Sequence, residues 1–163
     1  TTTATRNTDV LTYDASNGNA TFTNTYEVQT LSPSLDIISD RNIFGIGVDT
    51  NNRMGNYFKA SNDFIQSIGV TGSVTQYDIA SNVDGSNGEN HINRTTVDTN
   101  SVNFYVDGVS QGSDTSATIL SSLASGLIVI NGRPGSTNPS TNMVFKRVRI
   151  FNKVVAPWII TEV

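Results

Sequence analysis

The chain has 163 residues, of which 36% are hydrophobic and 15% are charged, and its formal net charge is −4. This length suits a single domain with one substantial core. The acidic balance argues against nucleic acid as a partner, because phosphate binding needs a basic face. No apolar run reaches the roughly 18 residues of a membrane span, so we expect no membrane insertion. The chain has no cysteine, which excludes disulfides, thiolate metal sites and thiol nucleophiles.

The composition favours many short strands joined by many turns. About a third of the chain is Thr, Asn or Ser, and Thr fits strands whereas Asn and Ser fit turns. No helical period extends beyond one or two turns, and the best candidate is a short helix at Ile119–Ala124. No repeat, linker or break in composition divides the chain. We therefore predict an all-β fold, a two-sheet antiparallel β-sandwich, formed as one domain over residues 1–163.

Taken in chain order, β-branched and alternating runs predict strands at a short, regular spacing. The predicted strands are Asp9–Tyr13, Ala20–Val28, Ile43–Val48, Met54–Ala60, Phe64–Val70, Val74–Ala80, His91–Val97, Val102–Val106, Leu127–Asn131 and Met143–Phe151. Stretches rich in Gly, Asn, Asp, Ser or Pro separate them and predict loops. The predicted loops are Asp14–Asn19, Asp49–Arg53, Asn82–Asn90 and Gly132–Thr141.

The best-defined local unit is a hairpin that begins at Val102. Val102, Phe104 and Val106 alternate with polar residues, which is the period of a half-buried strand. Asp107 and Gly108 follow, and this pair suits the two positive-φ positions of a type I′ turn.

The closing strand contains one short basic run, Lys146–Arg149. Alternation along this strand predicts that Val148 and Ile150 face the core, while Arg147 and Arg149 face water. The run is therefore interpreted as the solvent face of a strand.

Four segments, in this order, resemble the concanavalin A-like lectin/glucanase superfamily, particularly its laminin G-like branch. Ala4–Leu11 resembles the first edge strand of such domains in tailed-phage tail-fibre and virion structural proteins. His91–Val97 with the hairpin at Val102–Gly108, then Leu127–Gly132, then Phe145–Asn152, resemble later strands of the family. Asn90 stands where the family commonly has Trp, which leaves open whether Asn93 or Arg94 faces the core.

The resemblance implies a jelly roll with binding surfaces on its loops or on its concave face. It also implies a non-catalytic domain of a virion or tail-fibre protein, at the virion surface or elsewhere outside the cell, that recognises a host-surface glycan or receptor. Domains of this kind commonly assemble as homotrimers. Two alternatives stay open. One is a structural virion protein, in capsid decoration or tail assembly, that binds only other virion proteins. The other is a secreted bacterial carbohydrate-binding or adhesion module.

The residues that catalysis would need are missing, so we expect no enzyme. Glycoside hydrolysis needs two carboxylates roughly 5–10 Å apart. The glutamates Glu27, Glu89 and Glu162 do not have the Glu-x-Asp spacing of the superfamily's glucanases. His91 is the one imidazole, and no nucleophile motif accompanies it. No cofactor is required.

Sugar binding calls for an exposed aromatic plane beside polar hydrogen-bonding groups. Tyr57 and Tyr105 alternate with apolar neighbours, so we expect both tyrosines to face outward. The candidate ligand-binding residues are Arg53, Asn56, Tyr57, Tyr77, Asn103, Tyr105 and Asp107. Trp158 is expected to pack the chain end onto the sandwich or onto a neighbouring subunit.

Two loops rich in Asp and Asn could hold calcium, because hard cations prefer carboxylate and amide oxygens. The candidate ligands are Asp49, Asn51 and Asn52 in one loop and Asp84, Asn87 and Glu89 in the other. Neither loop matches an EF-hand, and turn formation explains the same residues.

Overall fold

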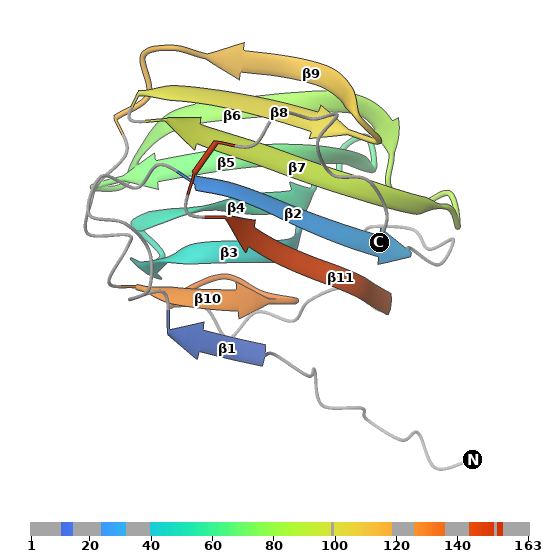
Figure 1. The fold of residues 1–163 in the computed structure, drawn as a ribbon, viewed down its shortest axis with the longest axis horizontal. Helices are drawn as coiled ribbons and strands as arrows, with labels where there is room; N and C mark the ends of the chain where they lie inside the picture. Colours follow the sequence, from blue (N-terminus) through green and yellow to red (C-terminus); the bar gives the residue numbers. More distant parts are fainter. Residues whose placement is uncertain are drawn as a thin grey trace.

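The computed structural model describes residues 11–14, 24–31, 40–98, 100–118, 126–135, 144–151 and 153–154. These residues form strands and turns, arranged in two layers (Figure 1). Across these residues, no helix has the length and apolar character to cross a membrane.

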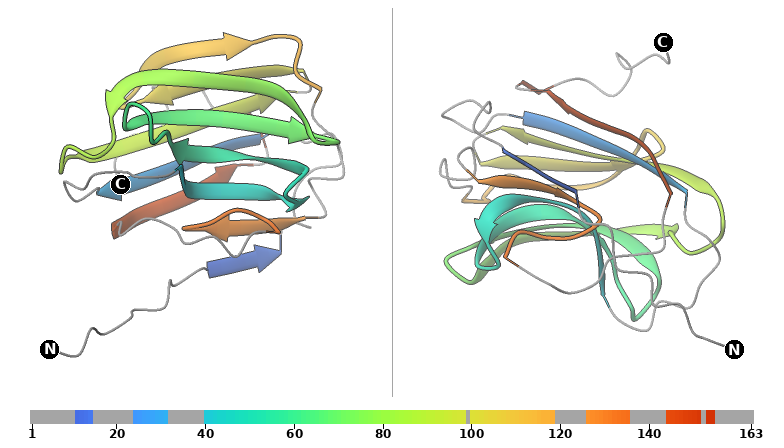
Figure 2. Two further views of the ribbon diagram at one scale, coloured as in Figure 1. Left: turned by 180° about the vertical axis from the view of Figure 1, so that it is seen from behind. Right: turned by 90° about the horizontal axis from the view of Figure 1, so that it is seen from below.

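One layer is a six-stranded sheet in the order β1-β10-β3-β4-β5-β6, and the other is a five-stranded sheet in the order β11-β2-β7-β8-β9. The six strands are β1 (Leu11–Asp14), β10 (Leu127–Ile130), β3 (Arg41–Asp49), β4 (Asn52–Phe58), β5 (Phe64–Thr71) and β6 (Val74–Asp84). The five are β11 (Val144–Phe151), β2 (Asn24–Leu31), β7 (Asn90–Asp98), β8 (Ser101–Val106) and β9 (Val109–Asp114). All neighbouring strands pair antiparallel, and the two sheets face each other (Figure 2). The predicted two-sheet sandwich is confirmed.

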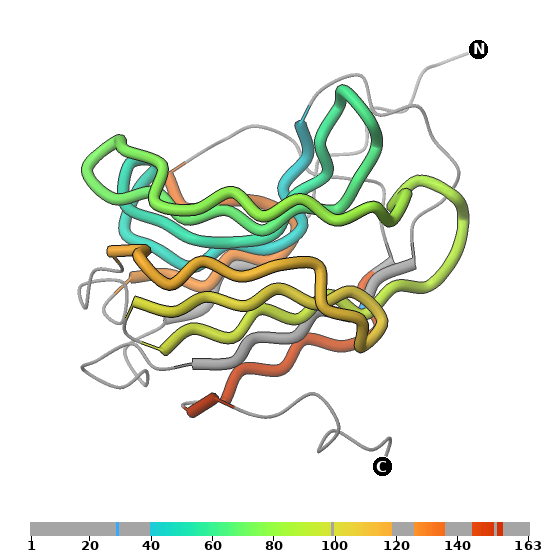
Figure 3. Tube along the Cα trace, turned by 90° about the horizontal axis from the view of Figure 1, so that it is seen from above, coloured from blue at the N-terminus to red at the C-terminus, as the bar shows by residue number. Residues whose placement is uncertain are grey.

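Alternation along the strands turns one face of each sheet into the core. In β8, Val102, Phe104 and Val106 are buried as predicted, and Met54 and Phe58 of β4 belong to the same core cluster. At one side of the sandwich the edge strands β6 and β9 lie side by side (Figure 3). There the methyl group Cγ2 of Ile79 would lie 2.9 Å from a Cβ added to Gly112. Gly112 therefore lets the two sheets approach closely at this side.

The predicted hairpin turn is confirmed, but its second strand was missed. Asp107 has φ 51° and Gly108 has φ 80°, and Val106 pairs with Val109 across them, as a type I′ turn requires. The missed strand is β9, whose sequence VSQGSD has neither apolar alternation nor aromatic residues. Pairing with β8 rather than its own propensity makes it a strand.

Three other predictions need correction or lie outside the described residues. The predicted loop Asn82–Asn90 is shorter, because β6 continues to Asp84 and β7 begins at Asn90. Val148 packs against the core as predicted, whereas Ile150 is 39% exposed on the edge strand β11. The candidate helix Ile119–Ala124 falls in the part of the chain that is not described.

A seam of buried polar side chains runs between the two sheets. Ser67 Oγ of β5 lies 3.0 Å from Thr95 Oγ1 of β7, which also donates to Asn56 Oδ1 of β4 at 3.5 Å. Asn93 faces the core, because it pairs with the core residue Val106, and Arg94 faces away. Asn93 is fully buried, and neither its amide nitrogen nor its amide oxygen has a hydrogen-bond partner. Burial of this unpaired amide therefore lowers the stability of the folded state.

We predict that Asn93→Leu raises the free energy of unfolding by about 1 kcal/mol, because leucine has a similar size and buries no unpaired polar group. Urea unfolding monitored by Trp158 fluorescence measures the change. Thr95→Val is the contrasting variant, and it should destabilise the protein because it leaves Ser67 and Asn56 without their shared partner. A loss of stability in Asn93→Leu would contradict the prediction and would mean that the amide holds an internal water.

Candidate functional site: the outer face of the six-stranded sheet

The face of the six-stranded sheet that points away from the core carries a group of charged and polar side chains. Met54 and Asn56 of β4 face inward, so Arg53, Gly55 and Tyr57 face outward. Across the sheet Tyr57 pairs with Gln66 of β5, and Gln66 pairs with Ala80 of β6. Asp78, two residues before Ala80, therefore shares this outer face.

Tyr57 is tied into this face by its hydroxyl group. The Tyr57 hydroxyl donates to Gln66 Oε1 at 2.7 Å and lies 3.1 and 3.2 Å from the two carboxylate oxygens of Asp78. Burial, together with the negative charge of Asp78, raises the pKa of Tyr57 well above its usual range. The side chain is only 6% exposed, so the prediction of an exposed aromatic plane at Tyr57 is wrong. The group that this position can offer to a ligand is the exposed carboxylate of Asp78, which lies against the Tyr57 hydroxyl.

Arg53 lies beside a second arginine, Arg133, which follows β10. The chain after β10 lies against Gly45 of β3, where an added Cβ would be 2.7 Å from Pro134 Cδ and 3.2 Å from Arg133 Cα. The missing side chain at Gly45 thus lets this segment cover the outer face. Burial and the positive charge of Arg133 lower the pKa of Arg53 from its ordinary value. Arg53 also donates through Nη1 to the carbonyl oxygen of Thr50.

We refer to Arg53, Tyr57, Gln66, Asp78 and Arg133 as the outer-face cluster. Lys59 and Asp40 form its rim. Lys59 Nζ lies 5.8 Å from the centroid of the Tyr57 ring and 3.4 Å from Asp40 Oδ2. Sequence reasoning found Arg53 and Tyr57 but missed Gln66, Asp78 and Arg133.

The structure does not bring the predicted ligand-binding residues together. Asn56 and Tyr77 are 1% and 3% exposed and face the core, so their assignment to a binding surface is wrong. Tyr105 and Asn103 do face away from the core, but on the five-stranded sheet, opposite the outer-face cluster. Both are half-buried.

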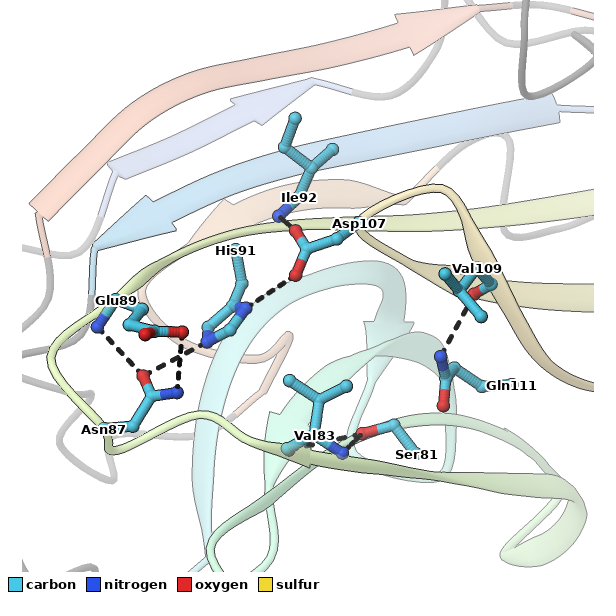
Figure 4. A network of polar contacts seen from close by, with 9 residues as sticks. All are labelled: Ser81, Val83, Asn87, Glu89, His91, Ile92, Asp107, Val109 and Gln111. Carbon is cyan, nitrogen blue, oxygen red and sulfur yellow. Dashed lines mark hydrogen bonds and ion pairs between the residues drawn. The ribbon is translucent and has the colours of Figure 1, made fainter.

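Asp107 links the turn between β8 and β9 to the beginning of β7 (Figure 4). One carboxylate oxygen accepts from the backbone nitrogen of Ile92 at 2.7 Å, and the other lies 2.8 Å from His91 Nδ1. The other ring nitrogen of the buried His91 lies 3.2 Å from Asn87 Oδ1, which already accepts from the backbone nitrogen of Glu89. Asp107 thus has a structural role, and its assignment to a binding surface stays a prediction from the sequence.

The carboxylates of the two candidate calcium loops brace their own turns. Asp49 Oδ1 accepts from the backbone nitrogens of Asn51 and Asn52 at 2.7 and 2.9 Å. Asp84 Oδ1 accepts from the backbone nitrogen and the hydroxyl of Ser86, both at 2.8 Å. In the described part of the chain, no three His, Cys, Asp or Glu side chains gather as a metal site. Calcium binding stays a prediction from the sequence.

The fold is a jelly-roll β-sandwich, as solved structures indicate. Mouse laminin alpha1 chain domains LG4-5 have a TM-score of 0.68 and 12% identity, over 90% of this chain and 40% of that one. The CBM40 of the Ruminococcus gnavus IT-sialidase, solved bound to alpha2,3 sialyllactose, has a TM-score of 0.65 and 14% identity, over 90% and 88%.

Domain 4 of AbnA, an extracellular GH43 arabinanase of Geobacillus stearothermophilus solved with arabinotriose, has a TM-score of 0.64 and 14% identity. The aligned region is 83% of this chain and 63% of that one. This chain thus spans less than two thirds of the laminin and arabinanase chains, and at these identities the likeness shows the fold alone. No family model and no curated protein matches the chain.

We predict that Tyr57→Phe reduces the loss of stability at alkaline pH. The pKa of Tyr57 is raised above 10.0 in the folded state, so the unfolded chain loses this proton first as the pH rises. The unfolded state then binds fewer protons, and the wild-type protein loses stability above about pH 10. Urea unfolding at pH 8, 10 and 11 measures the difference between the two proteins. Because the phenol is protonated in both states at pH 8, a difference that stays constant from pH 8 to pH 11 would contradict the prediction.

Proposed function

We propose that the chain is a non-catalytic glycan-binding domain and that the outer-face cluster is its binding site. The observation that carries the proposal is that Arg53 and Tyr57 share the outward face of β4 and that the exposed carboxylate of Asp78 lies against the Tyr57 hydroxyl. Guanidinium, phenol, amide and carboxylate groups together supply the donors and acceptors that sugar hydroxyls need.

Solved structures of the same fold support a glycan as the partner. The Ruminococcus gnavus CBM40 is solved with sialyllactose and the arabinanase domain with arabinotriose. A further similar structure is that of botulinum neurotoxin type C, whose entry into cells is described as dependent upon interaction with two ganglioside molecules. These facts concern those proteins, and they make sugar binding the first function to test in this one.

Recognition at the outer-face cluster rests on hydrogen bonds and not on ring stacking. The ring of Tyr57 is buried, so it offers no exposed plane to a sugar. Asp78 is exposed, and its carboxylate is held in place by the Tyr57 hydroxyl. Arg53 and Arg133 are half-buried and present donors from the other end of the cluster.

The biological setting of the proposed domain rests on the sequence resemblance. The resemblance places the domain at the surface of a virion or tail fibre, outside the cell, with a host receptor as its ligand. It also implies a homotrimer that has other virion proteins as partners. A structural virion protein and a secreted bacterial module remain the alternatives. The segments that would favour one of them, Ala4–Val10 and the region around Trp158, lie outside the described residues.

The test is binding of the purified chain to a broad glycan array, with Asp78→Asn as the site variant. Asparagine keeps the size of the side chain and one carbonyl oxygen beside the Tyr57 hydroxyl, but it removes the charged acceptor. We expect about tenfold weaker binding of the sugar that the wild-type protein selects. Tyr105→Ala, on the outer face of the opposite sheet, is the control and should bind as the wild-type protein does.

Two results would contradict this proposal. A blank array from folded wild-type protein would remove glycan binding as the function. Binding that Tyr105→Ala abolishes and Asp78→Asn leaves intact would move the site to the five-stranded sheet. The same array, run with calcium and then with a chelator, tests the calcium prediction separately.

A further inference from the structure

The outer-face cluster holds two guanidinium groups that form no ion pair with a described carboxylate. Arg53 and Arg133 come from different parts of the chain but lie over neighbouring positions of β3: Arg133 Cα would be 3.2 Å from a Cβ added to Gly45, and Gly47, two residues further along the same face, pairs with Arg53. The positive charge of Arg133 also lowers the pKa of Arg53. The Nε–H group of Arg133 is buried and has no hydrogen-bond partner. Holding two cations together and leaving one of their donors unpaired costs free energy in the folded state. Such an arrangement is stabilised when an anion binds between the two groups.

The acidic groups nearby do not supply that anion. The ion pairs among the described residues are Lys59 with Asp40 and His91 with Asp107, so no described carboxylate lies within 4.0 Å of either guanidinium. Asp49 attracts Arg53, but its carboxylate accepts hydrogen bonds from the turn after β3. Asp78 lies against the Tyr57 hydroxyl, at the other end of the cluster.

We propose that Arg53 and Arg133 form an oxyanion subsite and that the ligand is an acidic sugar, whose carboxylate or sulfate lies between the two guanidiniums. This inference rests on the proposed glycan-binding function and specifies its ligand. Guanidinium groups bind planar oxyanions through paired N–H donors, which an ammonium group does not match. The neutral part of the sugar then extends over the sheet toward the exposed carboxylate of Asp78, which accepts from its hydroxyls.

Lactose, sialyllactose and sulfated lactose are the probes, with binding to the purified chain measured by calorimetry. We expect at least one of the two acidic sugars to bind about tenfold more tightly than lactose, as charge-assisted hydrogen bonds predict. Arg53→Gln and Arg133→Gln should each reduce this preference for the acidic sugar over lactose by about tenfold. Arg147→Gln makes the same change of charge on β11 of the opposite sheet and should retain the full preference.

The possible outcomes separate the two proposals. A preference for sialyllactose alone identifies a carboxylate and a preference for sulfated lactose alone a sulfate, and both support the subsite. Equal binding of all three sugars would overturn the oxyanion subsite and leave the glycan-binding proposal in place. Binding of none of them would overturn the subsite, and a blank glycan array would overturn the glycan-binding function as well. A preference that survives in both arginine variants, or that Arg147→Gln also removes, would place the anion elsewhere. Circular dichroism of each variant verifies that it is folded.

Discussion

The pairing of β4 between β3 and β5 is the constraint on which the core and the outer-face cluster both depend. Because a strand alternates its side chains with a period of two, the register that buries Met54 and Phe58 also turns Arg53 and Tyr57 outward. A slip of one residue would exchange the two sets completely. Gly55 permits this register, since a Cβ at this position would lie 2.1 Å from the carbonyl oxygen of Phe44 in β3. The pairing of β4 therefore determines both which side chains form the core and which side chains form the outer-face cluster.

The fold could be predicted from the sequence because its signals are local. The hairpin at Val102–Val109 contains both its alternation and its turn residues within eight positions. The two sheets then follow from many short strands with no helical period. The strand β9 could not be predicted, because its polar residues are held in a strand by the neighbouring β8 and not by their own preference.

The site was harder to predict because polar residues occupy both faces of the six-stranded sheet. Asn56 and Tyr57 are adjacent and polar, and nothing in their types indicates that the first belongs to the seam and the second to the outer face. Arg133 lies in a predicted loop, and its contact with β3 depends on residues far apart in the sequence. Gly45 was the one signal for this contact, because a glycine inside a strand often marks the close approach of another backbone segment.

The Asp- and Asn-rich turns explain why the sheet face, and not the loops, is the better candidate for binding. Five of these side chains accept a hydrogen bond from the backbone nitrogen two residues later: Asp49, Asn62, Asp84, Asn87 and Asp114. This bond is the one that makes Asp and Asn good turn formers, and it engages the oxygen that a ligand or ion would need. Asp78 lies in the middle of a strand, where no turn uses its carboxylate, and its described partner is the hydroxyl of Tyr57. A carboxylate that the backbone does not need, on the same face as two arginines that form no ion pair with a described carboxylate, distinguishes this face from the loops.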